Sequence, residues 1–301
     1  MLLFIMHSMA HAASTDNTRS SNRSGPIVVT VKPLYSLVAQ LTAGIETPVL
    51  LMKQMQSPHH YTMKPSQRRL LANARIIIWL GPQLESYLTK IIQQQSTETV
   101  TALQAKNLKL LKLRHKASHQ HNSGRIKADE THMIDPHVWL STENTAAISR
   151  QITDALIKNN PENTAIYQRN LETLLQKIVQ THRFIKTTLQ GKQQPFIAFH
   201  DAFQYFEAEN GLNYIDSISF DDETSSSLRH IREISASIDK HNIRCLVYQP
   251  PKPALIDTLT KRTNIKATAL DPLGLNLSDN KNAWFDIMRQ LALNFEHCLG
   301  H

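Results

Sequence analysis

The chain has 301 residues, of which 41% are hydrophobic and 19% are charged, so it can bury a sizeable core and is not predicted to be disordered throughout. Its formal net charge of +8 comes from basic residues that are scattered and seldom stand beside aromatic ones, which argues against nucleic-acid binding. No run of about 18 apolar residues occurs, so the sequence predicts no membrane-spanning helix.

Residues 1–25 are predicted to be a signal segment followed by a disordered leader. Leu2 to Met6 form a short apolar run, and the Ala-His-Ala sequence at 10–12 resembles a small-x-small cleavage site, although no Lys or Arg precedes the run. A Ser/Asn/Thr-rich stretch follows at 14–25. We therefore expect an exported protein; the alternative is a frayed N-terminus.

Short apolar runs alternate with helix-period segments in the first half of the chain. RIIIWL at 75–80 is typical of a fully buried strand, and Gly81-Pro82 opens a helix that runs to about Ile92. The expected strands are 27–31, 48–52, 75–80 and 107–113, and the expected helices are 33–41, 66–72 and 81–92.

Two longer helices follow, at 143–158 and 162–189, and the second is long for a globular protein. It has too few heptads for a coiled coil, so a helix that bridges two α/β halves fits better. Beyond it the alternation resumes, with expected strands at 195–199, 212–219, 244–248 and 266–270 and expected helices at 202–209, 225–240, 253–262 and 282–299.

Strands that alternate with helices indicate βαβ units and parallel sheets. We expect an α/β fold of two Rossmann-like (β/α) lobes with parallel sheets, joined by a long rigid linker helix, with a cleft between the lobes. The expected divisions are an N-terminal lobe at 26–160, a linker helix at 161–190 and a C-terminal lobe at 191–301.

Four segments place a potential metal ligand just after an expected strand: SPHHY, IDPHVWL, FIAFHDAF and ALDPLG. Ligands of open parallel sheets bind at the carboxyl ends of the strands, so two facing sheets would bring these segments into one cleft. Three imidazoles and one carboxylate are a donor set that suits Zn²⁺. The candidate ligands are His59, His137, His200 and Asp271.

The two cysteines, Cys245 and Cys298, leave two interpretations open. Either they form one disulfide, which an oxidising compartment would preserve, or they are two inert buried thiols.

The string SPHHYTMKPSQRRLLANARIIIWLGPQLESYL, followed by DPHVWLS, FIAFHDAFQYFE and LDPLG in that order, resembles the cluster A-I solute-binding proteins of metal ABC importers. Within that group it is similar to the periplasmic zinc-binding proteins of the ZnuA type. The resemblance covers the chain from about Ile27 to its end. It implies a metal cleft between the lobes, an exported protein without enzymatic activity, and delivery of Zn²⁺ to the membrane permease of an ABC importer.

The resemblance carries the ligand roles onto His59, His137, His200 and Asp271. Manganese-type relatives have a carboxylate at the third position, so the imidazole of His200 favours Zn²⁺. It also implies a Cys245–Cys298 disulfide.

The sequence departs from the resemblance at two places. Some zinc-binding relatives have a Glu directly before the first ligand, where this chain has Pro58, so Asp271 or water is left to complete the shell and His60 is a possible auxiliary ligand. Residues 114–133 resemble a metal-collecting loop that Lys and Arg dilute, and a plain solvated loop fits them equally well. Its possible auxiliary ligands are His115, His119, His121 and His132.

Two other functions stay open at this point. One is a manganese- or iron-type binding protein of the same family. The other is a zinc-dependent hydrolase, for which Asp201 or Glu223 would be the general base. A fourth protein ligand would close the site and argue for transport. We expect a monomer that does not bind nucleic acid.

Overall fold

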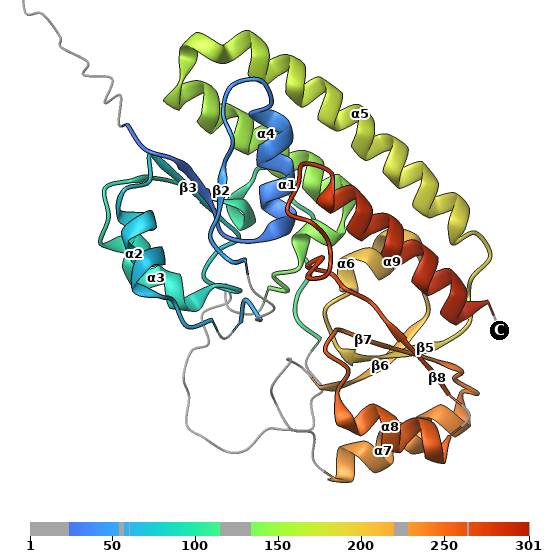
Figure 1. Ribbon diagram of the computed structural model, residues 1–301. Helices are drawn as coiled ribbons and strands as arrows, with labels where there is room; N and C mark the ends of the chain where they lie inside the picture. The colour runs from blue at the N-terminus through green and yellow to red at the C-terminus, as the bar shows by residue number, and fades with distance from the viewer. Residues whose placement is uncertain are drawn as a thin grey trace, which may run out of the picture.

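The computed structural model describes residues 24–53, 57–59, 61–114, 134–219, 228–263 and 265–300, which form two four-stranded sheets, each parallel throughout (Figure 1). The first sheet has the order β2-β1-β3-β4 and the second the order β6-β5-β7-β8. The strands are β1 (Ile27–Val29), β2 (Val49–Leu50), β3 (Ile76–Trp79), β4 (Glu98–Thr101), β5 (Phe196–His200), β6 (Tyr214–Ser219), β7 (Cys245–Tyr248) and β8 (Lys266–Ala269). The expected α/β fold of two lobes is therefore confirmed, and both lobes use the same strand order.

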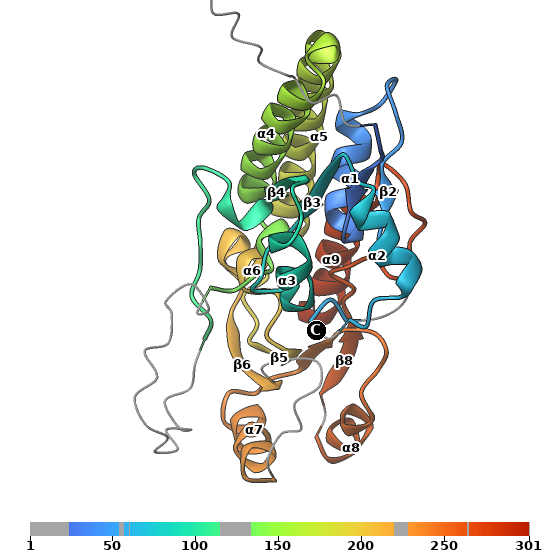
Figure 2. The same ribbon diagram turned by 90° about the vertical axis from the view of Figure 1, so that its left-hand side faces the viewer.

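The helices of the described residues are α1 (Lys32–Leu41), α2 (Pro65–Ala72), α3 (Thr89–Gln93), α4 (Thr142–Asn159), α5 (Thr164–Thr188), α6 (Gln204–Asn210), α7 (Leu228–Lys240), α8 (Ala254–Arg262) and α9 (Ala283–Leu299). In the second lobe, α9 lies on one face of the sheet and α7 and α8 on the other (Figure 1, Figure 2). In the first lobe, α2 and α3 cover the outer face and α1 the inner one. No helix among these residues combines the length and the apolar character that crossing a bilayer would require.

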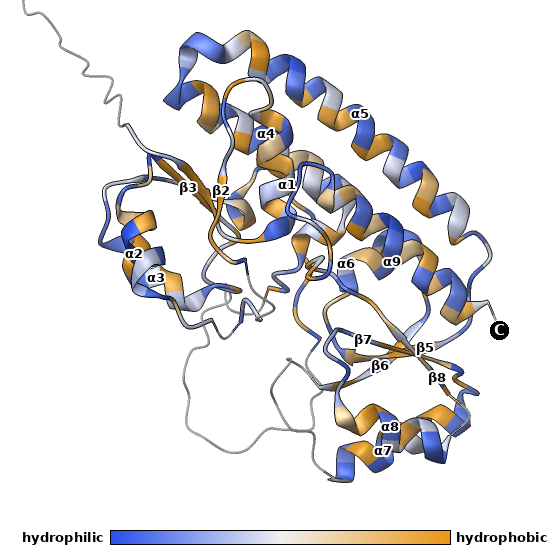
Figure 3. Ribbon diagram, in the orientation of Figure 1, coloured by the Kyte–Doolittle hydropathy of each residue, from blue (hydrophilic) through white to orange (hydrophobic). Residues whose placement is uncertain are grey.

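The alternation of side chains along each central strand divides the apolar residues between two layers. In β3, Ile76 and Ile78 face the main core, whereas Ile77 faces α2 and α3. In β5, Phe196 faces the main core and Ile197 faces α7 and α8. Both faces of the sheets are covered, and β3 is accordingly apolar along its whole length (Figure 3).

Helix α5 runs along both lobes and connects α4 of the first lobe to β5 of the second, as expected for the linker helix (Figure 1). Its 25 residues span about 37 Å at 1.5 Å per residue. Along this length α5 packs against α1, α4 and α9, so it contacts elements of both lobes. Near its start Asn170 donates to the carbonyls of Leu41 and Ala43, each at 2.9 Å.

One expected strand is wrong. Residues 107–113 form no strand and make one isolated bridge, between Lys112 and Ile134, while the fourth strand of the first sheet is β4. The segment instead crosses toward the second lobe, and side chains satisfy its backbone: the amide of Lys109 donates to Asn144, and that of Leu111 to Tyr205. The expected helix 81–92 is also shorter, because a 3₁₀ turn at Ser86–Leu88 precedes α3.

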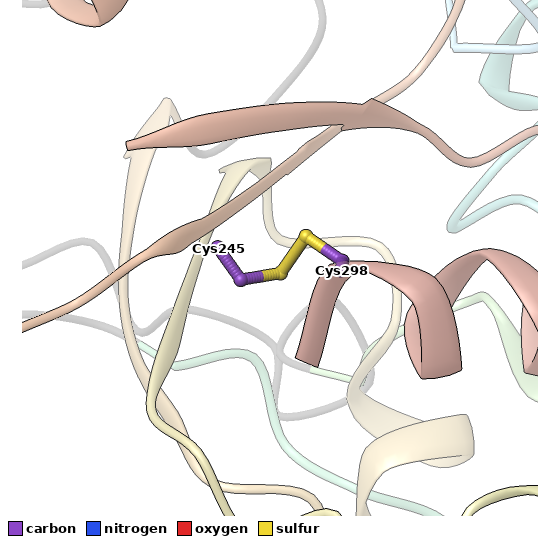
Figure 4. Close-up of a disulfide and its surroundings, with 2 residues drawn as sticks. All are labelled: Cys245 and Cys298. Atoms are coloured by element: carbon purple, nitrogen blue, oxygen red, sulfur yellow. A yellow bond between two sulfur atoms is a disulfide. The ribbon is translucent and has the colours of Figure 1, made fainter. Parts of the chain in front are cut away.

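Cys245 and Cys298 form a disulfide between β7 and the last turn of α9 (Figure 4). Their Cα atoms are 5.3 Å apart, and both residues are buried in the main core. The bond therefore fastens the C-terminal helix to the centre of the second sheet.

Replacing both Cys245 and Cys298 by Ala should lower the free energy of unfolding. Their separation of 53 residues corresponds to about 4 kcal/mol in the chain-entropy account of a disulfide. Urea denaturation of both proteins measures the difference, and a reductant should shift the wild type alone toward the variant. Coincident denaturation curves for the two proteins would contradict the assignment of a stabilising role.

Glu85 is a fully buried carboxyl group just beyond the end of β3. Its Oε2 accepts a hydrogen bond of 2.7 Å from the amide of Leu80, which holds the chain where it leaves the strand. Burial raises the pKa of Glu85 to about 7, against the opposing effect of hydrogen bonds from Thr30, Leu80 and Gly81. The folded protein therefore keeps a proton on Glu85 that the unfolded chain loses above pH 4.5.

This raised pKa predicts a stability that falls as the pH rises. The contribution is fully present below pH 4.5 and is lost as the pH passes through about 7. Glu85→Gln mimics the protonated side chain. The free energy of unfolding of the variant should therefore rise relative to that of the wild type by about 1–3 kcal/mol as the pH goes from 5 to 8. Denaturation at several pH values tests this, with Glu162→Gln, at an exposed carboxylate, as the control. A pH-independent difference would contradict it.

Candidate metal centre

Three histidines meet between the lobes. One ring nitrogen of each of His59, His137 and His200 lies within 4.8 Å of the others, and the ring centroids are 5.5 to 5.7 Å apart. His59 comes from the turn that follows β2, and His200 is the last residue of β5. The two sheets thus point their carboxyl ends at one place, as the fold class leads one to expect.

His137 reaches the same place from an irregular segment. It precedes the 3₁₀ turn Val138–Leu140, and no described strand leads into it beyond the bridge at Ile134. The strand expected before this residue would fall within 115–133, which lie outside the described residues. His137 and His200 are buried, and His59 is half-buried.

A buried carboxylate orients His137. Oδ1 of Asp135 lies 2.7 Å from Nδ1 of His137 and also accepts from the backbone amide of His137 at 2.9 Å. A carboxylate can only accept, so Nδ1 carries the proton and Nε2 keeps a lone pair for a metal. Asp135 is not among the candidates predicted from the sequence; the signal that points to it is a carboxylate two residues before a candidate ligand histidine.

Tyr205 of α6 holds this orienting group in place. Its hydroxyl donates to the carbonyl of Asp135 at 2.9 Å and accepts from the amide of Leu111 at 3.0 Å. A residue of the second lobe thereby fixes the segment that carries His137.

Two buried tryptophans connect the loop of His137 to that of Asp271. The indole of Trp139 donates to the carbonyl of Pro272 at 2.8 Å, and the indole of Trp284 donates to the carbonyl of Trp139 at 2.9 Å. The ring of Trp139 also stands 5.2 Å from that of His137. These contacts close the side of the site that faces the core.

Asp271 lies outside the group of three imidazoles. Its carboxylate accepts from the amides of Leu273 at 3.2 Å and Asn276 at 3.3 Å, both in its own loop. The loop still borders the site, since a small pocket of about 10 Å³, with room for about one water molecule, lies there. Its lining consists of Pro58, His59, His137, Trp139, Gln249, Pro272 and Leu273.

The remaining candidate ligands cannot be placed. The auxiliary positions His60, His115, His119, His121 and His132 lie outside the described residues, as does Glu223.

A second group of charges lies beside His200. Asp201 follows it in the chain, is buried, and has its Oδ1 3.3 Å from Nη1 of Arg114. Burial raises the pKa of Asp201, and Arg114 opposes this. His137 and His200 are also close enough to act on Asp201 electrostatically. Glu207 forms an ion pair with the other terminal nitrogen of Arg114.

Asp135→Asn should weaken Zn²⁺ binding by about ten- to a hundredfold, because the charge that makes the His137 imidazole a better donor is lost. Titration of chelator-stripped protein against a zinc indicator measures the affinity. Asp257→Asn, at an exposed carboxylate of α8, is the control and should bind as the wild type does. Equal affinities for the Asp135 variant and the wild type would show that Asp135 does not tune the site.

Comparisons with known proteins agree over most of the chain. A family model described as ZnuA, zinc-uptake complex component A, periplasmic, matches residues 27–298. The high-affinity zinc uptake system protein ZnuA of Brucella suis biovar 1 (strain 1330) is 30% identical over 305 residues, which cover 91% of each chain.

Two solved structures share the fold. A crystal structure of ZnuA superimposes with a TM-score of 0.76 at 18% identity, covering 92% of this chain and 99% of that one. The structure of the protein FpvC from Pseudomonas aeruginosa in complex with Mn²⁺ superimposes with a TM-score of 0.78 at 15% identity, covering 92% and 98%.

Proposed function

Because this chain belongs to the ZnuA family of periplasmic zinc-uptake components, we propose that it captures Zn²⁺ outside the cytoplasm and delivers it to the permease of an ABC importer. The relatives are named for high-affinity zinc uptake. In this role Zn²⁺ is the cargo, and the protein works as an exported monomer.

The meeting of His59, His137 and His200 is the observation that carries the proposal. Three neutral imidazoles provide a donor set that binds Zn²⁺ well, at about 2.0–2.1 Å from each nitrogen. They leave a fourth position for a carboxylate or for water. We infer that these three residues are the zinc ligands.

We keep Asp271 as the proposed fourth ligand. Its loop borders the site, and its two hydrogen bonds, at 3.2 and 3.3 Å, are long ones that a metal could replace. Water in the same position would leave the three imidazoles as the only protein ligands.

The fold alone does not distinguish a zinc carrier from a manganese carrier, since FpvC shares it and binds Mn²⁺ in its structure. The third position distinguishes them, because Mn²⁺ prefers oxygen ligands and this chain offers an imidazole at residue 200. A zinc hydrolase would need Asp201 or Glu223 as its general base; the carboxylate of Asp201 is paired with Arg114, and Glu223 lies outside the described residues. Transport therefore remains the better-supported function.

Metal titration of the chelator-stripped protein should show one tight Zn²⁺ site, from which Mn²⁺ does not displace Zn²⁺. His137→Ala or His200→Ala should weaken Zn²⁺ binding roughly tenfold or more, because each removes a ligand. His241→Ala, an exposed imidazole after α7, is the matched control and should leave the affinity unchanged.

Each result has a distinct meaning. Tight Mn²⁺ binding would keep the importer and replace its cargo. Unchanged zinc affinity in both ligand variants would reject the site, and the absence of tight binding by the wild type would reject the function.

A further inference from the structure

Arg114 extends from the first lobe into a buried acidic site of the second. The segment that ends at Arg114 lies along α6, where Leu111 donates to Tyr205 and the side chain of Gln204 donates to the carbonyl of Lys112. This segment brings the guanidinium to the carboxylate of Asp201, the residue that follows His200 in the chain.

Three groups surround the guanidinium. Nη1 is 3.3 Å from Oδ1 of Asp201, and Nη2 is paired with Glu207. The central carbon stands 3.8 Å from the ring centroid of Tyr214, at the start of β6. Asp201 is 7% exposed and Glu207 3%, so one cation faces two buried carboxyl groups beside an aromatic ring, and burial raises the pKa of Glu207 to about 8.

Asp201 is the carboxylate that the ion pair places next to the imidazole group. It directly follows His200, and it interacts electrostatically with His200 and His137. A free carboxylate there would add a hard oxygen donor to the three imidazoles. Oxygen donors shift the preference of a site from Zn²⁺ toward Mn²⁺. Asp201 is not part of the group that His59, His137 and His200 form, and its Oδ1 is instead paired with Nη1 of Arg114.

We propose that Arg114 is a positioning residue for metal selectivity: it holds the Asp201 carboxylate out of the coordination sphere, so that the site presents imidazoles to the metal and discriminates against Mn²⁺. The proposal rests on the zinc-carrier function and extends it to a residue that is not itself a ligand. Glu207 fixes the other side of the guanidinium, which prevents it from following Asp201.

The test uses Co²⁺ bound to the full chain as a probe, because visible absorption by Co²⁺ weakens when its coordination number rises above four. In Arg114→Met the released carboxylate should bind as a fifth donor beside the three imidazoles and Asp271, so the Co²⁺ band should weaken. The preference for Zn²⁺ over Mn²⁺ should fall about tenfold or more. A loss of packing alone would not change the coordination number.

A second substitution identifies Asp201 as the cause. Arg114→Met combined with Asp201→Asn should restore the wild-type spectrum and selectivity, and Arg114→Lys, which keeps the charge, should retain both. Arg75→Met removes another half-buried arginine, paired with Glu46 at the opposite end of the first sheet, and serves as the matched control. It should leave the spectrum unchanged.

Arg114→Met leaves two buried carboxylates without their cation, so it is first checked for cooperative thermal unfolding. If it fails to fold, Arg114→Met with Glu207→Gln removes one of the two charges, and the same changes in spectrum and selectivity are expected of it.

The outcomes separate this inference from the function on which it rests. A wild-type spectrum and selectivity in a folded Arg114→Met protein overturn the inference alone, as does a changed spectrum that Asp201→Asn fails to reverse. A wild type that binds neither Zn²⁺ nor Co²⁺ overturns the proposed function and the inference with it.

Discussion

Side chains of both lobes pack into one continuous hydrophobic core along α5 and α9. The core contains Ile76 and Ile78 of the first sheet, Phe196 of the second, and Trp284 of α9 between them. A shared core fixes the distance and angle between the two sheets, and three imidazoles from separate segments can share one ion only if that geometry is held to a fraction of an ångström. The metal centre therefore depends on the packing between the lobes.

Polar contacts reinforce this arrangement. Lys32 of α1 donates to the carbonyls of Gly274 and Leu277 in the loop after β8 and pairs with Asp279. On the other side, Glu209 of α6 accepts from the amide and the hydroxyl of Thr142 and so caps the first turn of α4. Contacts of this kind, on both sides of the site, disfavour a wide hinge opening between the lobes.

The electrostatics of the site follow from where its carboxylates are directed. Asp135 faces the ring Nδ1 of His137, one of the proposed ligands, whereas Asp201 and Glu207 face Arg114. Asp135 thus has a hydrogen-bond donor, and Asp201 and Glu207 share one cation, because an unpartnered charge is costly in the low dielectric of the interior. The nearby carboxylates thus bind protein groups, and the site offers mainly imidazole nitrogens. Such a donor set suits a borderline metal such as Zn²⁺.

The sequence by itself determined the alternation of strands and helices, the two lobes and the long helix between them, because apolar periodicity is a local property of the chain. It also placed His59, His137 and His200 as candidates, and the family resemblance implied the Cys245–Cys298 bond. Only the tertiary structure decided that the three imidazoles meet, that Asp271 bonds within its own loop, and that 107–113 forms no strand. Asp135 contacts His137 only two residues away in the chain, whereas Arg114 and Glu207 belong to this second group as well. Their roles depend on contacts between residues up to 93 positions apart, which exist only once the lobes share one core.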